Sequence, residues 1–364
     1  MPSTVIDPID WKTITERIRK GLCVPFLGAA ANATNEEEKY KYEGLPLGGD
    51  LALRMIGTIT ELDIEEIESD LKDLNNIGVV KRLLQYPDYK GLARVALQDL
   101  TRVALLVRYK TDFDIFINLL KEFIPDNKRQ PSLLLKTLAS IPKFGLIVTT
   151  NYDRLMERAL QEAGEHLEVI VQRVRGFSEE EQEEVREQMA KRGARVVYKM
   201  HGTFVEDEVL EGDKQSGVDK KPETSREADV GNEVKDVRGD LASQLIISED
   251  DYIQFLTVIG QAKVGVPDPV KATMIDSTLL FLGYGLEDWD FRTLHKGLIE
   301  TLTHQKKRKS FAIQKDPSDV MVSFWEKKDV RIYNIDLYEF AEQLRERCQK
   351  EGLYKEVPPT RVEG

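Results

Sequence analysis

His201 follows the apolar run VVYKM and is the residue of this sequence best suited to move a proton near neutral pH. Histidine has an unperturbed pKa close to neutrality, which suits general acid or base catalysis. It stands in the segment KMHG at 199–202, where Gly202 would let a ligand approach the backbone closely. A single histidine is also often structural, so this segment alone leaves both roles open.

A second polar segment, TTNYD at 149–153, follows the apolar run FGLIV. Ligands of open α/β sheets bind beyond the carboxyl ends of the strands, so Asn151 and Asp153 are well placed to contact one. Either residue could instead only cap the helix that starts here. This segment alone does not decide between the two roles.

Two turns rich in small residues could meet a phosphate or a sugar. GAAAN at 28–32 leaves the apolar run 22–27, and such a strand end lets the backbone approach a pyrophosphate. Ala30 stands where a second glycine is expected, and a tight turn without a ligand is the competing interpretation. GYGLED at 283–288 begins like a GxGxxG fingerprint; the turn could face a ribose, and Asp288 could equally cap a helix.

Each of these segments lies at the end of a short β-rich run, and such runs alternate with helical patterns along the chain. Strands are expected at 22–27, 144–150, 169–172, 194–200, 245–248, 277–283, 310–313 and 331–335. Helices are expected at 10–20, 151–163, from a capping box at Ser178 and Glu181, at 249–256, from about 287, between the last two strands, and up to about 349. The alternation predicts an α/β fold, with a Rossmann-like parallel sheet and helices on both faces.

A leucine-rich run of helices from about 50 to 124 interrupts this alternation. We therefore expect an inserted helical subdomain at 50–130, within a Rossmann-like domain formed by 1–49 and 131–364. The segment 205–240 holds twelve acidic and six basic residues and no aromatic residue, so it has little to bury. We expect an exposed or disordered loop there.

The composition argues against several classes of function. Hydrophobic residues make up 41% of the 364 residues, yet no apolar run reaches the ~18 residues that cross a bilayer, and the start lacks the features of a signal peptide. We therefore expect a cytoplasmic protein without membrane contact. The formal net charge of −12 argues against direct nucleic-acid binding by this chain. The short run KKRK at 306–309 is expected to be a solvated connection.

Cysteine usage bears on metal binding. Cys23 and Cys348 are the two cysteines of the sequence, so one chain has no four-cysteine zinc site. Free cysteines usually behave as small buried hydrophobes, and that is the expectation for both.

Together, and in this order, the segments resemble the sirtuin family, in particular the zinc-less, NAD-hydrolysing sirtuin-like domains of bacterial antiphage-defence proteins. The resemblance covers roughly residues 12–340 and rests on FLGAAAN at 26–32, TTNYD at 149–153, HG at 201–202, DDY at 250–252 and GYGLED at 283–288. Two departures stand out. Ala30 replaces a glycine of the first turn, and the two cysteine pairs that hold zinc in deacetylating sirtuins are absent.

The resemblance implies an NADase, a metal-independent hydrolase that uses NAD as substrate, holds no zinc, and releases nicotinamide and ADP-ribose. Asn151 would hydrogen-bond the nicotinamide ribose or the attacking water, His201 would act as general base, and Asp153 would orient groups on the nicotinamide side. The loop 28–32 would hold the pyrophosphate, and the turn 283–285 would meet the adenosine half. The residues implied to contact NAD are Gly28, Ala29, Ala30, Asn32, Thr150, Gly283, Tyr284 and Gly285.

A free NADase would be toxic to its own cell, so the resemblance also implies control by assembly. We expect a homo-oligomer that depletes NAD in antiphage defence, an abortive-infection strategy. The chain leaves no room for a sensor domain, so we expect a separately encoded sensor, with a HerA-like ATPase as the preferred candidate. The alternative is a non-catalytic module or scaffold that holds NAD or ADP-ribose; Ala30 favours the module, and the intact Asn151 and His201 favour the enzyme.

Overall fold

Seven parallel strands form the centre of the molecule, seen in a computed structural model that describes residues 9–60, 99–173, 175–203, 245–259, 265–286, 291–292, 295–296 and 309–356. The strands lie in the order β3-β4-β2-β1-β5-β6-β7. Their bounds are β1 Cys23–Leu27, β2 Leu146–Thr149, β3 His166–Val171, β4 Ala194–Lys199, β5 Thr278–Leu282, β6 Ser310–Gln314 and β7 Val330–Asn334. The central strands are continuous apolar runs because helices cover both of their faces.

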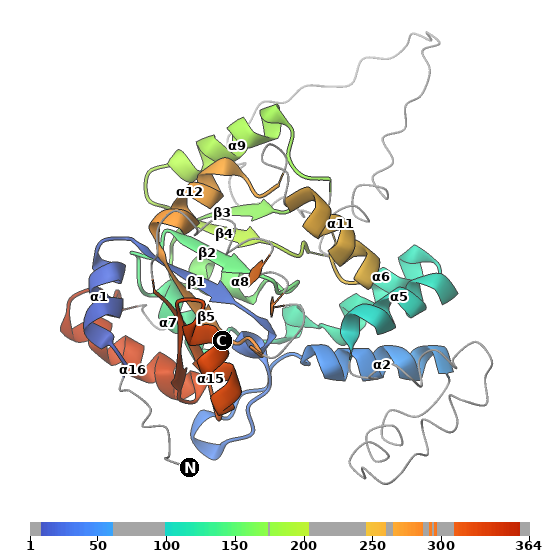
Figure 1. The fold of residues 1–364 in the computed structure, drawn as a ribbon, viewed down its shortest axis with the longest axis horizontal. Coiled ribbons are helices and arrows are strands. Elements are labelled where there is room, and N and C mark those ends of the chain that lie inside the picture. The colour runs from blue at the N-terminus through green and yellow to red at the C-terminus, as the bar shows by residue number, and fades with distance from the viewer. Residues whose placement is uncertain are drawn as a thin grey trace, which may run out of the picture.

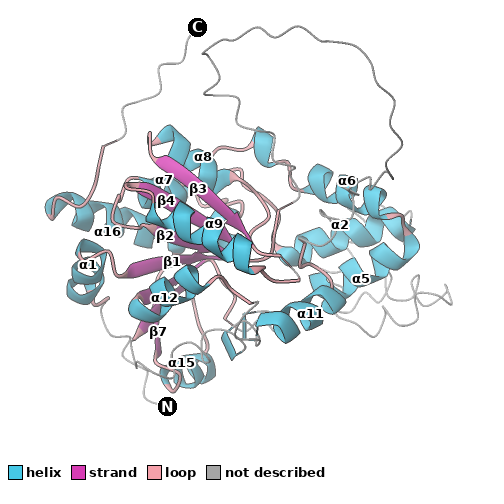
Figure 2. Ribbon diagram, turned by 90° about the horizontal axis from the view of Figure 1, so that it is seen from above, coloured by secondary structure: helices cyan, strands magenta, loops and turns pink. Residues whose placement is uncertain are grey.

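Helices lie on both faces of the sheet, which confirms the predicted α/β, Rossmann-like arrangement (Figures 1 and 2). Apolar residues of one group of helices share a core with one face; these are α1 Trp11–Arg19, α7 Leu133–Ala139, α8 Leu155–Glu162 and α16 Leu337–Lys350. A second core joins the other face to α9 Glu179–Ala190, α12 Asp268–Asp276 and α15 Asp319–Glu326. The predicted capping box of Ser178 and Glu181 is present at the start of α9.

Three helices of the predicted insertion, α2 Gly48–Thr60, α5 Leu100–Lys110 and α6 Phe113–Phe123, follow β1 in the chain and precede β2. They extend to one side of the sheet, with α11 Glu249–Ile259 beside α5 (Figure 1). Leu51, Val103 and Phe116 belong to the same core as the first face of the sheet. The exact limits of a separate subdomain at 50–130 stay a prediction.

The segment 245–248 corrects one prediction, because it is not a strand. Its four residues are buried, yet they are tied to the fold by single hydrogen bonds and not by a ladder. The Ile246 N–H donates to the His201 carbonyl at 3.1 Å, and the Tyr152 hydroxyl donates to the Ile246 carbonyl at 2.6 Å. An apolar run of this length is typical of a strand, but a buried irregular segment before a helix has the same composition.

Several predicted features lie outside the described residues. They are the loop at 205–240, Asp288 with most of the helix from about 287, and residues 306–308 of the basic run. Cys23 and Cys348 are free and buried, as expected. In the part of the chain that the structure describes, no helix is both long and apolar enough to cross a membrane.

Candidate functional site at the carboxyl edge of the sheet

The four polar or glycine-rich segments meet at one edge of the sheet. They follow β1, β2, β4 and β5, which are neighbours in the order β4-β2-β1-β5. Every pairing among these strands is parallel, so their carboxyl ends point the same way. Open α/β sheets bind ligands at such an edge, where connections diverge to opposite faces.

Asn151 is fixed by the ends of two strands. Its backbone N–H donates to the Thr149 Oγ1 at 3.0 Å, and its side-chain Nδ2 donates to the Gly28 carbonyl at 3.1 Å. Thr150 completes the connection, because its N–H donates to the Leu27 carbonyl and its hydroxyl lies 3.0 Å from that of Tyr284. The amide is thereby held in place between the β1 and β2 turns.

Asp153 is buried, and its carboxylate accepts hydrogen bonds from two other parts of the protein. Its Oδ1 accepts from the Leu155 N–H at 2.9 Å, at the start of α8, and from the Asn32 Nδ2 at 2.8 Å. Burial raises the pKa of the Asp153 carboxyl, and the Lys199 ammonium opposes that rise. The carboxylate therefore pairs with the first N–H of α8 and links the 28–32 loop to the β2 turn, and its contact with a ligand stays a prediction.

Lys199 and Glu157 form an ion pair that sequence reasoning missed. The Lys199 Nζ donates to the Glu157 Oε1 at 3.0 Å and also to the Asp153 carbonyl. The Lys199 and Glu157 side chains are 1% and 5% exposed, so the pair is fully inside the protein. A charged residue at the end of an apolar strand was the available signal, but the strand pattern does not reveal its partner.

His201 lies buried directly after β4. The Tyr252 hydroxyl is 3.2 Å from its Nδ1, and the rings of Tyr252 and Phe255 contact its ring edge-on. Its Nε2 is buried and has no hydrogen-bond partner among the described residues. Burial lowers the pKa of His201 to about 3, so the imidazole is neutral at physiological pH.

The DDY segment at 250–252 explains how α11 holds this histidine. Asp251 caps the helix by accepting from the Ser248 N–H at 2.8 Å, and it forms an ion pair with Arg108 of α5 at 2.7 Å. This fixed helix start places Tyr252 against His201. The aspartate is therefore structural, and the tyrosine is the residue that reaches the site.

The two small-residue turns pack against each other. The Gly28 N–H donates to the Leu282 carbonyl at 2.9 Å, and the Ala30 N–H donates to the Gly283 carbonyl at 3.0 Å. A methyl group built on Gly28 would lie 2.6 Å from the Gly283 oxygen. The turns after β1 and β5 thus leave no room for a side chain at either glycine. The role of the 28–32 loop toward the pyrophosphate, and that of the 283–285 turn toward the adenosine half, stay predictions.

We expect Gly283→Ala to destabilise the protein more than Gly193→Ala. Both glycines have φ of +79°, but a methyl on Gly283 would lie 2.3 Å from the Ala31 nitrogen, whereas one on Gly193 meets no atom within 4 Å. The backbone conformation costs about 1–2 kcal/mol in each variant. Overpacking should add about 1–3 kcal/mol for Gly283 alone.

Urea unfolding of both variants measures this difference. Equal losses of unfolding free energy would mean that the turns at 28–32 and 283–285 separate readily. Their close packing would then not contribute to stability.

Metal-ligating side chains are not grouped here: within the described ranges, no cluster of three or more His, Cys, Asp or Glu residues has the arrangement to hold a metal ion.

Comparison with known proteins finds a family match that includes three of the four strand ends at this edge. The model of the SIR2-like domain family matches residues 145–333, which include β2, β4, β5 and the side chains of Asn151, Asp153 and His201. The chain is also 24% identical over 220 residues to "Defense-associated sirtuin 2" of Bacillus subtilis. That alignment covers 60% of this chain but only 17% of the relative, so the chain spans a small part of the relative's length.

Proposed function

Since this chain belongs to the family of SIR2-like domains, we propose that it is an NAD glycohydrolase that releases nicotinamide and ADP-ribose. One observation carries the proposal. The buried Nε2 of His201 has no partner among the described residues, and it lies at the sheet edge that also holds Asn151 and Asp153. A buried polar atom without a partner is costly, and a bound substrate or its water would satisfy it.

Hydrolysis needs the bond between the ribose C1′ and the nicotinamide nitrogen to break, with its electron pair leaving on nicotinamide. A water oxygen then bonds to C1′, and its proton passes to a base. When the His201 Nδ1–H donates to the Tyr252 hydroxyl, the neutral Nε2 lone pair is free to accept a hydrogen bond from this water. Because burial makes His201 a weak base, the proton moves to Nε2 only as the water oxygen bonds to C1′ and its protons become strongly acidic. Asn151 hydrogen-bonds the ribose or the water, and Asp153 orients the nicotinamide side.

A second buried atom supports the same placement. The Oδ1 of Asn32 has no hydrogen-bond partner among the described residues, although its Nδ2 donates to Asp153. An amide donor, such as that of a carboxamide, would satisfy this oxygen. We propose that the nicotinamide amide lies near Asn32 and Asp153.

The relative's name leads us to propose antiphage defence by depletion of the cytoplasmic NAD pool. The activity would be switched by assembly, through a homo-oligomer and a separately encoded sensor such as a HerA-like ATPase. An NADase that is always active would harm its own cell, and that is the argument for such control.

A non-catalytic module that holds NAD or ADP-ribose is the second candidate. Ala30 favours it, since its N–H donates to the Gly283 carbonyl in place of a ligand phosphate. The two candidates differ in one respect: both bind NAD, and only the enzyme consumes it.

Incubation of the purified chain with NAD, alone and with candidate partners, tests the proposal. Equal amounts of nicotinamide and ADP-ribose should appear, at a rate indifferent to added acetylated peptide, and chelators should not reduce it. Intact NAD that stays bound would favour the module. Turnover that depends on the peptide and yields O-acetyl-ADP-ribose would contradict the hydrolase and indicate a deacetylase.

The low pKa of His201 gives an expected pH dependence. The imidazole is protonated only below about pH 3, so its titration should not reduce the rate of NAD cleavage between pH 8 and 5. A fall in rate with a midpoint near the ordinary histidine pKa, abolished by substitution of His201, would show that the residue is hydrated and contradict its burial.

A further inference from the structure

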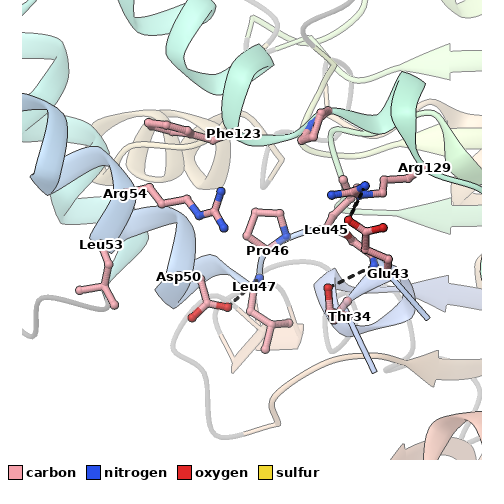
Figure 3. A pocket seen from close by; sticks show the side chains of 13 residues that line it. Thr34, Glu43, Leu45, Pro46, Leu47, Asp50, Leu53, Arg54, Phe123 and Arg129 are labelled. Carbon is pink, nitrogen blue, oxygen red and sulfur yellow. Dashed lines mark hydrogen bonds and ion pairs between the residues drawn. The ribbon is translucent and has the colours of Figure 1, made fainter. Parts of the chain in front are cut away.

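A cavity of about 560 Å³ lies beside the candidate site, between the loop 33–47, α2 and the end of α6. Figure 3 shows its side chains, with Leu45, Pro46 and Phe123 forming apolar walls. Its lining includes neither Asn151 nor His201. The volume falls in the range of about 300–1,000 Å³ that is typical of small-molecule sites.

Arg54 of α2 points its guanidinium group into this cavity (Figure 3). Its Nε is buried without a hydrogen-bond partner, and the side chain forms no ion pair with a carboxylate in the described part of the chain. The Arg54 side chain as a whole is half-buried, but its Nε–H is closed off from water, and a buried donor without a partner is unfavourable. An anionic group between the walls would satisfy it.

The other charged groups of the cavity already have partners. Arg129 lies 2.8 Å from the Glu43 Oε1 through its Nη1 and donates from its Nε to the Gly44 carbonyl at 3.0 Å. Asp50 accepts from the Leu47 N–H at 3.4 Å. Among the lining residues that the structure describes, Arg54 is therefore the cation left for a ligand, with Arg129 on the opposite wall (Figure 3).

We propose that this cavity binds a nucleoside monophosphate, with the phosphate on Arg54 and the flat base against the apolar walls. A guanidinium fork matches phosphate oxygens in a bidentate geometry, and such charge-assisted hydrogen bonds are about twice as strong as neutral ones. Phe123 and Pro46 give the base a surface to cover. The walls and the cation together select an anion that carries an apolar body.

The cavity is joined to the candidate site by direct contacts. Arg129 holds Gly44, and the Leu45 N–H donates to the Asn32 carbonyl at 2.7 Å. A methyl built on Gly44 would lie 2.2 Å from that same carbonyl oxygen, so the loop is packed tightly on Asn32. Asn32 in turn donates to Asp153. Occupancy of the cavity therefore acts on Asn32, and any effect on NAD cleavage rests on the proposed function.

Isothermal titration of the full chain with AMP and with adenosine tests the binding itself. AMP should bind and adenosine should bind at least about tenfold more weakly, because the phosphate carries the contact with Arg54. Arg54→Met should weaken AMP binding by about tenfold or more. Arg192→Met, which removes an exposed arginine between α9 and β4, should leave it unchanged.

Further controls test AMP binding independently of the proposed NADase activity. Melting temperatures should show that Arg54→Met folds, since the buried Nε has no hydrogen-bond partner among the described residues. His201→Ala should bind AMP as the wild type does. No AMP binding by the wild type, equal binding of adenosine, or loss of binding in His201→Ala with retention in Arg54→Met would overturn the proposal.

Discussion

Replacing His201 by alanine should reduce the rate of NAD cleavage by about 10²–10⁴-fold, because a general base contributes an effect of that size. The fold should survive. His201 loses a 3.2 Å hydrogen bond to Tyr252, but the variant also removes a buried Nε2 that has no partner among the described residues. The rate is measured as nicotinamide released per chain, and circular dichroism with thermal melting reports the fold.

His166→Ala is the matched control. His166 is exposed on β3, where its Nε2 lies 2.9 Å from the Glu168 carboxylate. The substitution His166→Ala should therefore leave the rate of NAD cleavage unchanged. Asn151→Ala should match the loss of His201→Ala, since it removes the amide that is held at the Gly28 carbonyl. A folded His201→Ala that cleaves NAD at the rate of the wild type would remove the histidine from the mechanism.

The sequence predicted the sheet edge well because the signal there is local. Each of the four segments follows a run of apolar residues, and in a parallel sheet all strand ends of this kind fall on one side. The prediction does not require the order of the strands within the sheet to be known. The strand predicted at 245–248 is wrong because the prediction used only this local signal. An apolar pattern indicates burial and does not indicate pairing with another strand.

Contacts between segments distant in the chain were beyond such reasoning. The glycines at 28 and 283 predicted contacts with a phosphate and with a nucleoside, but the sequence did not reveal that each also makes room for the other turn. Arg54 is an ordinary helix residue in the sequence, and its isolation becomes visible only when the cavity around it is known. Partner choice depends on three-dimensional packing, which periodicity does not encode.

The Lys199–Glu157 pair is the clearest case of a contact that determines the state of the site. The ammonium donates to the Asp153 carbonyl and opposes the rise that burial imposes on the Asp153 pKa. The Lys199 charge therefore favours the ionised form of the Asp153 carboxyl, whose Oδ1 accepts from Asn32. The Oε2 of Glu157 has no partner among the described residues, so this carboxylate depends strongly on Lys199.

Lys199→Met should lower the free energy of unfolding by about 3–5 kcal/mol, because it leaves the buried Glu157 carboxylate without its cation. Adding Glu157→Gln should recover part of that loss, since an uncharged amide tolerates burial better. The recovery stays incomplete, as the Asp153 carbonyl still lacks the ammonium donor, a deficit of about 1–3 kcal/mol.

Urea unfolding of the two variants and the wild type measures both steps, and Lys20→Met is the control. Lys20 forms an exposed pair with Glu16 at 2.6 Å, and its loss should leave the unfolding free energy nearly unchanged. If Lys199→Met were as stable as Lys20→Met, water would have to reach Glu157 in the folded state. A double variant less stable than Lys199→Met would show instead that the Glu157 carboxylate has other stabilising partners, and Lys199 would then not be its main source of stability.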